Sequence, residues 1–221
     1  MLDSQTLAMM AEGTGATLYM TLMSTLFGYI LGLPMGIILV VTAPKGLRPN
    51  QVVYRILDGI VYITRRIPFL ILMILIMPFT RILVGKTYGT TATIVPLALA
   101  AAPFIARMVE SSLLEVDHGV IEAAQSMGAS LWTIIWKVLL AEARTSLIVG
   151  ATIALGTILG YSAMAGPIGG GGLGDIAMRY GYYRYQADIM IIAVVLLVLL
   201  VQILQVVGMI LSKKLDRRNT R

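Results

Sequence analysis

Residues that could do chemistry are few in this sequence. The chain has no cysteine and a single histidine, His118, which argues against a thiolate nucleophile and against a metal held by imidazole. Ionisable residues within apolar stretches mark ion pathways when they occur, and the main candidates are Asp58 and Glu110. Arg107 precedes Glu110 by three residues and shares its helix face, which predicts a local ion pair. We therefore expect no catalytic group and no metal site.

A run of glycines offers a second kind of chemistry, the binding of phosphate. The stretch 159–175 reads LGYSAMAGPIGGGGLGD, but it lacks the Lys-Ser/Thr pair of a nucleotide-binding loop. Glycine is costly in a helix interior and Pro167 removes a hydrogen bond, so we expect a helix break over 166–174. The break is either a tight external turn or a mobile end that opens a path. In the second interpretation the pathway or gate candidates are Tyr161, Ser162, Ala163 and Met164.

Membrane helices are the elements that must position these residues. Of the 221 residues, 58% are hydrophobic and 13% are charged, whereas about 25% are charged in soluble domains. Four uncharged runs can cross a hydrocarbon core of about 30 Å, and a fifth can if Arg65, Arg66 and Arg81 snorkel to the interfaces. These runs are 13–44, 87–106, 145–174 and 189–212, with 67–80 as the shorter fifth. We predict an all-α polytopic protein with five transmembrane helices; a buried or re-entrant helix is the alternative for 67–80.

The distribution of lysine and arginine predicts the orientation of these helices. Basic residues gather in segment 43–66, in loop 107–144 and in tail 213–221, and the intervening segments carry few. Because cytoplasmic loops are enriched in these residues, the N-terminus is predicted outside and the C-terminus in the cytoplasm. The net charge of +6 therefore serves topology, and no nucleic-acid partner is expected.

Small residues line one face of the first predicted span. Gly28, Gly32 and Gly36 recur at every fourth position, so another helix can approach closely along that face. Pro34 removes a backbone hydrogen bond and predicts a kink in the same helix. We expect these four residues to serve helix packing; a direct contact with substrate is the alternative.

The polar loop between the third and fourth spans predicts two short helices. Asp117 can cap a helix over 119–127, Gly128 suits the left-handed position that ends it, and Ser130 can cap the next helix. In that second helix an apolar face is formed by Leu131, Ile134, Ile135 and Val138. The loop is either a solvated connector or a docking element, and the exposed His118 is not expected to be a ligand.

A motif in this loop resembles the EAA loop of ABC importer permeases. The family pattern is Glu-Ala-Ala, three residues, Gly, nine residues, then an aliphatic residue, any residue, Leu and Pro. The matching positions are Glu122, Ala123, Ala124, Gly128, Val138 and Leu140. Ala141 stands where the family usually has proline. Longer segments, among them RRIPFLILM and GYSAMAGPIGGGGLGDIAMRYGYYRYQ, are similar to the permease subunit of bacterial methionine importers, and the similarity covers about residues 14–210.

The resemblance implies a single transmembrane domain over 1–221 that imports methionine, in the L and D forms, across the bacterial inner membrane. It implies that two copies form the pathway and that each docks a cytoplasmic ATPase through a coupling loop at 115–141. It further implies that the ATPase binds ATP and Mg²⁺, that this chain binds no cofactor, and that a substrate-binding lipoprotein delivers methionine. The alternatives are a same-family permease for another amino acid, a channel or ion-coupled transporter, and a non-transporting scaffold subunit.

Overall fold

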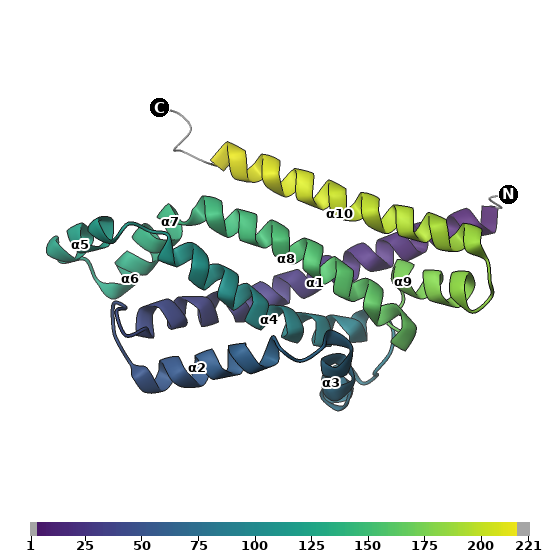
Figure 1. Ribbon diagram of the computed structural model, residues 1–221, viewed down its shortest axis with the longest axis horizontal. Helices are drawn as coiled ribbons and strands as arrows, with labels where there is room; N and C mark the ends of the chain where they lie inside the picture. The colour runs from purple at the N-terminus through teal and green to yellow at the C-terminus, as the bar shows by residue number, and fades with distance from the viewer. Residues whose placement is uncertain (1–3, 216–221) are drawn as a thin grey trace. The chain divides into compact units, whose positions relative to one another are not determined.

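The computed structural model describes residues 4–215, and within them every regular element is a helix (Figure 1). The helices are α1 (Ser4–Thr42), α2 (Gln51–Thr64), α3 (Phe69–Val84), α4 (Thr90–Leu114), α5 (His118–Ser126), α6 (Leu131–Thr133), α7 (Leu140–Glu142), α8 (Arg144–Ala165), α9 (Gly172–Ile176) and α10 (Ala187–Leu215). A π-helical stretch, Ile134–Leu139, joins α6 to α7, and another, Ala177–Tyr182, follows α9. Residues 216–221 of the predicted tail lie outside the described residues.

Four of the five predicted spans correspond to helices that are long and apolar enough to cross a membrane. These are α1, α4, α8 with the turn after it, and α10. The predicted fifth span corresponds to α3, whose 16 residues cover only about 24 Å at a rise of 1.5 Å per residue. A fifth span is reached if α2 and α3, which a short break separates, are counted together. Pro68 lies in this break. Proline disfavours the helical conformation of the residue before it and suits the start of a helix, so it accounts for the end of α2 and the start of α3.

The chain divides into two compact units, and α1, α4, α8 and α10 each contribute residues to both. Unit 1 comprises Met1–Gly28, Ile67–Ala101 and Ala154–Gln205, and unit 2 comprises Tyr29–Arg66, Ala102–Ile153 and Val206–Arg221. One core cluster of unit 1 contains Met10, Leu159, Leu173, Ile176, Ala177, Ala193 and Leu200. A second cluster of unit 1 contains Met20, Phe69, Met73, Leu97 and Ala165. Burial of such apolar side chains stabilises each unit by about 25 cal/mol per Å².

Helices α1, α2 and α4 meet in unit 2 around Leu39, Val61 and Ala106, all fully buried. A Cβ atom built on Gly32 would lie 2.6 Å from the carbonyl oxygen of Ala102. Gly32, a member of the predicted glycine face, thus lies directly against the backbone of α4. 

Pro34 lies inside α1, which continues unbroken from Ser4 to Thr42. The proline therefore does not end the helix. Gly28, the first member of the predicted face, is buried as well. Its burial agrees with the predicted packing role.

Candidate functional site

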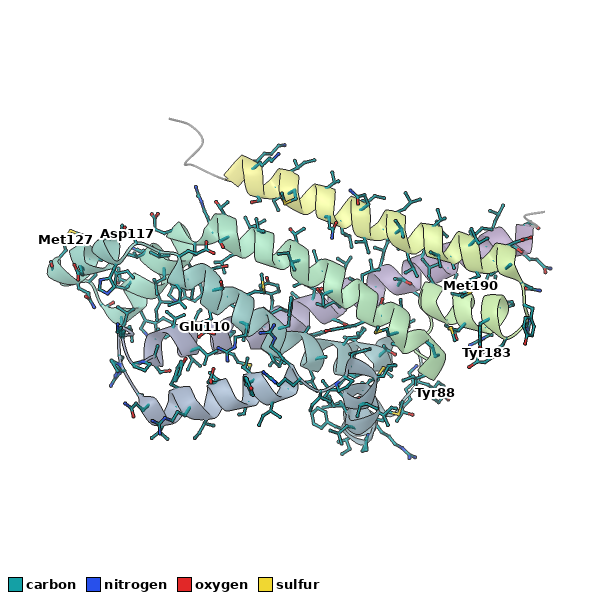
Figure 2. All side chains as sticks on the ribbon, viewed as in Figure 1. Tyr88, Glu110, Asp117, Met127, Tyr183 and Met190 are labelled. Carbon is teal, nitrogen blue, oxygen red and sulfur yellow. The ribbon has the colours of Figure 1, made fainter. Side chains whose placement is uncertain are left out.

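The loop helix α5 begins at the predicted cap. The carboxylate of Asp117 accepts a hydrogen bond of 2.7 Å from the backbone N–H of Gly119. This bond satisfies one of the N–H groups that have no partner at a helix start. The helix itself begins at His118, one residue earlier than predicted. Figure 2 labels Asp117 and Met127, which flank α5.

The end of α5 is a Schellman motif built on Gly128, whose φ is +76°. The N–H of Gly128 donates to the carbonyl of Gln125 at 2.9 Å, and the N–H of Ala129 donates to the carbonyl of Ala124 at 3.0 Å. These two bonds define the motif, and its left-handed position favours glycine. The turn predicted at Gly128 is confirmed.

The outer surface of α5 consists of small and polar residues together with one apolar side chain, Val120. Glu122 and Ala123 are exposed, whereas the neighbouring Ala124 is only 6% exposed and belongs to the core. Met127, which the sequence reasoning missed, is 81% exposed. We call Glu122, Ala123 and Met127 the docking face. Nδ1 of His118 lies 3.1 Å from the carboxylate of Glu122, one turn along the helix, and both side chains are exposed.

A semi-rigid support follows the docking face. The hydroxyl of Ser130 accepts a hydrogen bond from the N–H of Thr133 at 3.3 Å, as its capping role predicts. Ile134, Ile135 and Leu139 are buried. Leu131 of the predicted apolar face is half-buried, and so are the motif residues Val138 and Leu140. Val138 and Leu140 therefore present only part of their side chains to the surface.

The π-helical stretch in this support was not predicted. A π-helix adds a residue to the turn, which brings Leu139 into the core, where it is 1% exposed. On the solvent or membrane side, Trp132 and Trp136 are 69% and 58% exposed and lie one turn apart. Such an exposed tryptophan pair is typical of a membrane interface, and its i, i+4 spacing is the signal that could have found it.

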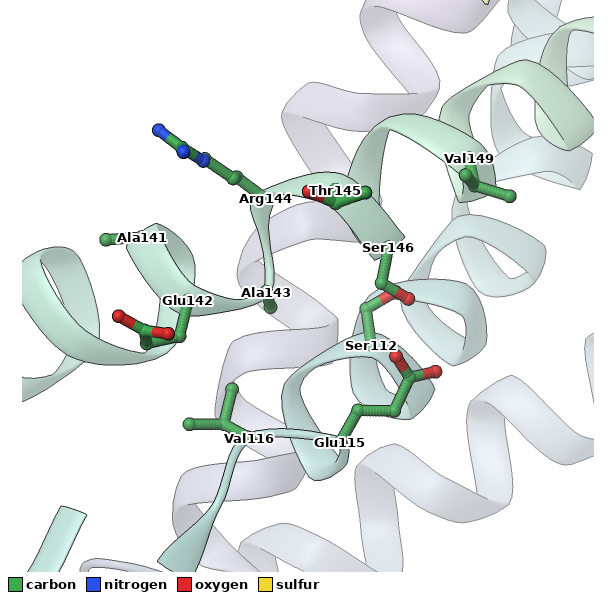
Figure 3. A pocket seen from close by; sticks show the side chains of 10 residues that line it. All are labelled: Ser112, Glu115, Val116, Ala141, Glu142, Ala143, Arg144, Thr145, Ser146 and Val149. Carbon is green, nitrogen blue, oxygen red and sulfur yellow. The ribbon is translucent and has the colours of Figure 1, made fainter. Parts of the chain in front are cut away.

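A pocket of about 420 Å³ lies where the loop enters α8 (Figure 3). Its lining residues are Ser112, Glu115, Val116, Ala141, Glu142, Ala143, Arg144, Thr145, Ser146 and Val149. Ser146 on α8 donates a hydrogen bond of 3.0 Å to Ser112 on α4. Ala141 lines this pocket, and the chain begins α8 at Arg144 without the proline that the family usually has.

The four gate candidates at the end of α8 have different surroundings. Tyr161 stacks on Phe69 with ring centroids 4.6 Å apart. Ser162 is 1% exposed and donates to the carbonyl of Leu159 at 2.7 Å. A buried serine satisfies its hydroxyl on its own helix in this way. Ala163 is half-buried and Met164 is 51% exposed, which leaves Met164 as the most accessible of the four.

The glycine-rich break predicted after α8 is confirmed. Helix α8 ends at Ala165, and Gly169, Gly171 and Gly172 all have positive φ. 

The buried hydroxyl of Thr17 fastens this segment to α1. It accepts a hydrogen bond of 2.9 Å from the N–H of Leu173 and donates one of 2.9 Å to the carbonyl of Gly13. A Cβ atom on Gly172 would lie 2.6 Å from the Thr17 oxygen, so glycine is required for this approach. The sequence reasoning missed Thr17 because nothing local to it indicates a partner so distant in the chain.

A charge cluster joins α2 and α4. Arg107 donates to Glu110 at 2.6 Å, which confirms the predicted pair, and it also pairs with Asp58. Figure 2 labels Glu110 on α4. The second partnership was not predicted. One guanidinium thus pairs with both of the carboxylates that the sequence offers as candidate ion-pathway residues.

The chain is similar to known membrane transport proteins. Residues 28–221 match the family model of the binding-protein-dependent transport system inner membrane component. The probable D-methionine transport system permease protein MetI of Vibrio cholerae is 50% identical over 210 residues, which are 95% of this chain and 93% of that protein. The D-methionine transport system permease protein MetI of Escherichia coli K12 is 50% identical over 158 residues, 72% of this chain and 73% of that protein.

A solved structure gives the same result. A chain of the MetNI methionine ABC transporter, determined in inward-facing conformations, superposes with a TM-score of 0.96. The two chains are 46% identical, and the match covers 97% of this chain and 100% of the other. This chain therefore belongs to the family of binding-protein-dependent transport system inner membrane components, the permease subunits that cross the cytoplasmic membrane several times.

Proposed function

We propose that this chain is the transmembrane subunit of an ATP-driven importer that carries methionine, in its L and D forms, into the cell. The observation that carries the proposal is the 50% identity, over 95% of the chain, to a permease named for D-methionine transport. The match to the MetNI methionine transporter chain supports it independently. A permease for another amino acid is the nearest alternative.

In this proposal two copies of the chain form the pathway, and each docks a cytoplasmic ATPase through the docking face. The ATPase binds ATP and Mg²⁺ and performs the hydrolysis, and a lipid-anchored binding protein delivers methionine from outside. The exposed Ala123 and the rigid turn at Gly128 support docking, because a small surface on a fixed helix suits insertion into a cleft. The N-terminus lies outside, which places α5 in the cytoplasm beside the ATPase. Met164 is the pathway residue that this proposal favours.

A single cysteine at Ala123 should crosslink to the ATPase in the complete transporter. The chain has no cysteine of its own, so the reaction reports one position. The matched control is Ala124→Cys, which faces the core at 6% exposure and should not crosslink. Gel mobility after oxidation or after a short bifunctional reagent measures the product. Absence of a crosslink at Ala123 under every nucleotide condition would refute the docking face.

Uptake of labelled methionine tests the function itself. Membrane vesicles that hold the complete transporter should accumulate methionine only with ATP and the binding protein, and excess unlabelled methionine should abolish the signal. Stronger competition by another amino acid would reassign the substrate within the family. Uptake that persists without ATP would instead indicate a channel or an ion-coupled transporter.

A further inference from the structure

A second pocket of unit 2, of about 320 Å³, is lined by Tyr62, Arg65, Arg66 and Arg107. Ligand pockets begin at about 300 Å³, so its volume suits a small molecule. Three of its four lining residues are arginines, which come from the end of α2 and from α4. In sequence, Arg65 and Arg66 are expected only to anchor a span at the membrane interface, but the structure gives them a common cavity.

The three guanidinium groups are not equivalent. Arg107 already engages the carboxylates of Asp58 and Glu110. Among residues 4–215, neither Arg65 nor Arg66 forms a salt bridge.

Aromatic rings hold the two remaining guanidiniums in place. The guanidinium carbon of Arg65 lies 5.6 Å from the ring centroid of Phe104, and that of Arg66 lies 4.2 Å from the ring centroid of Tyr62. Stacking on a ring face orients a guanidinium plane and leaves its N–H edge available. Within residues 4–215, the exposed Arg65 and Arg66 therefore each lie beside an aromatic ring and pair with no carboxylate.

Charges of both signs meet along the contact between the two helices. Asp58, Tyr62 and Arg65 stand at i, i+4 and i+7, so they share one face of α2. Arg107 and Glu110 lie on α4, a helix long and apolar enough to span the membrane. Charged residues inside spanning helices mark substrate paths.

We propose that this pocket is a subsite for the zwitterionic main chain of the transported amino acid. Arg65 and Arg66 hold its α-carboxylate, since a guanidinium binds a carboxylate through two parallel N–H donors. Asp58 is the nearest carboxylate available to the ammonium group: it does not line the pocket, but it pairs with the lining residue Arg107 through Oδ1, and its side chain is 35% exposed. The inference rests on the proposed import of an amino acid, and it adds a binding step within the permease.

Protection of a cysteine from labelling tests the subsite directly. The reporter is Ser111→Cys, an exposed position one turn after Arg107 on α4 and outside the pocket lining, in the complete transporter placed in nanodiscs of phosphatidylcholine. Methionine should slow its reaction with a thiol reagent. Methionine methyl ester, which lacks the free carboxylate, should need a concentration roughly 10- to 100-fold higher, as expected for the loss of a charged hydrogen bond. Equal protection by the two compounds would overturn the proposal.

Arginine variants on the reporter background supply the matched comparison. Arg65→Gln and, separately, Arg66→Gln should abolish protection. Arg55→Gln removes the same charge from an exposed position on α2 outside the pocket and should leave protection intact. Equal loss of protection in all three variants would show that protection depends only on net charge and would overturn the subsite.

Two further measurements distinguish a lipid headgroup from methionine as the ligand, and failure of the subsite from failure of the proposed function. Protection in phosphatidylethanolamine nanodiscs without any amino acid would assign the pocket to a lipid headgroup and overturn the proposal. Uptake of methionine by the wild-type transporter tests the proposed function independently of the subsite. If the wild type imports methionine and the reporter is never protected by it, the subsite alone is refuted.

Discussion

Replacing Gly36 with leucine should prevent α1 from seating against α4, and little folded protein should be recovered from the membrane. A Cβ atom at Gly36 would lie 2.7 Å from the carbonyl oxygen of Ala106 and 2.7 Å from Cβ of Val109. Both obstacles belong to the α4 backbone or to the stem of a β-branched side chain, so neither can rotate away. Overpacking costs about 1–3 kcal/mol even where neighbours relax. The measurement is the monodisperse fraction of detergent-solubilised protein after heating.

Two other substitutions test whether the close approach to α4 causes the loss. Gly36→Ala introduces only the Cβ atom and should lower the midpoint of thermal aggregation by an intermediate amount. Gly15→Leu, in the same helix, is the matched control, because nothing lies within 4 Å of a Cβ at Gly15. It should be recovered at the wild-type level. If Gly15→Leu and Gly36→Leu are lost equally, the close approach to α4 is not the cause.

Replacing Gly128 with valine should reduce methionine uptake to background while the protein stays in the membrane. No atom lies within 4 Å of a Cβ at this position, so the substitution creates no clash. The cost arises from the backbone, whose φ is +76°. A left-handed conformation costs about 1–2 kcal/mol for an L-residue, and a β-branched residue there is an outlier. The Schellman bonds would be given up and the docking face would be re-aimed.

A graded series distinguishes backbone strain from a role for an absent side chain. Asparagine tolerates the left-handed region better than other residues, so Gly128→Asn should keep most uptake and Gly128→Ala should be intermediate. Surface abundance, measured by blotting of washed membranes, should be equal across the series. Wild-type uptake by the valine variant would mean that the turn at Gly128 is dispensable.

The ends of the loop helices could be predicted from the sequence because every partner lies nearby in the chain. The Asp117 cap bonds a group two residues away, the Ser130 cap bonds one three residues away, and Gly128 closes bonds to residues three to five positions earlier. Fixed offsets of this kind leave a readable pattern of residue types. The long uncharged runs and the EAA motif are equally local, and together they indicated the fold class and the family.

The glycine face of α1 shows where such prediction stops. Spacing by four identified Gly32 and Gly36 as a contact surface, but it did not identify α4 as the helix that fills it. The hydrogen bond of Ser162 to its own helix could not be predicted for a related reason. Whether a serine faces a path or its own helix depends on burial, and only the neighbouring elements determine burial.

By itself, the sequence determined the apolar helices, the caps, the glycine-rich break and the family to which they belong. The tertiary structure alone decided which distant groups meet: Asp58 with Arg107, 49 residues apart, and Thr17 with the N–H of Leu173, 156 residues apart. The physical reason is that a pair at such separation has no fixed offset in the chain. Its members meet because whole helices pack through many weak apolar contacts, and no short pattern of residues encodes that sum.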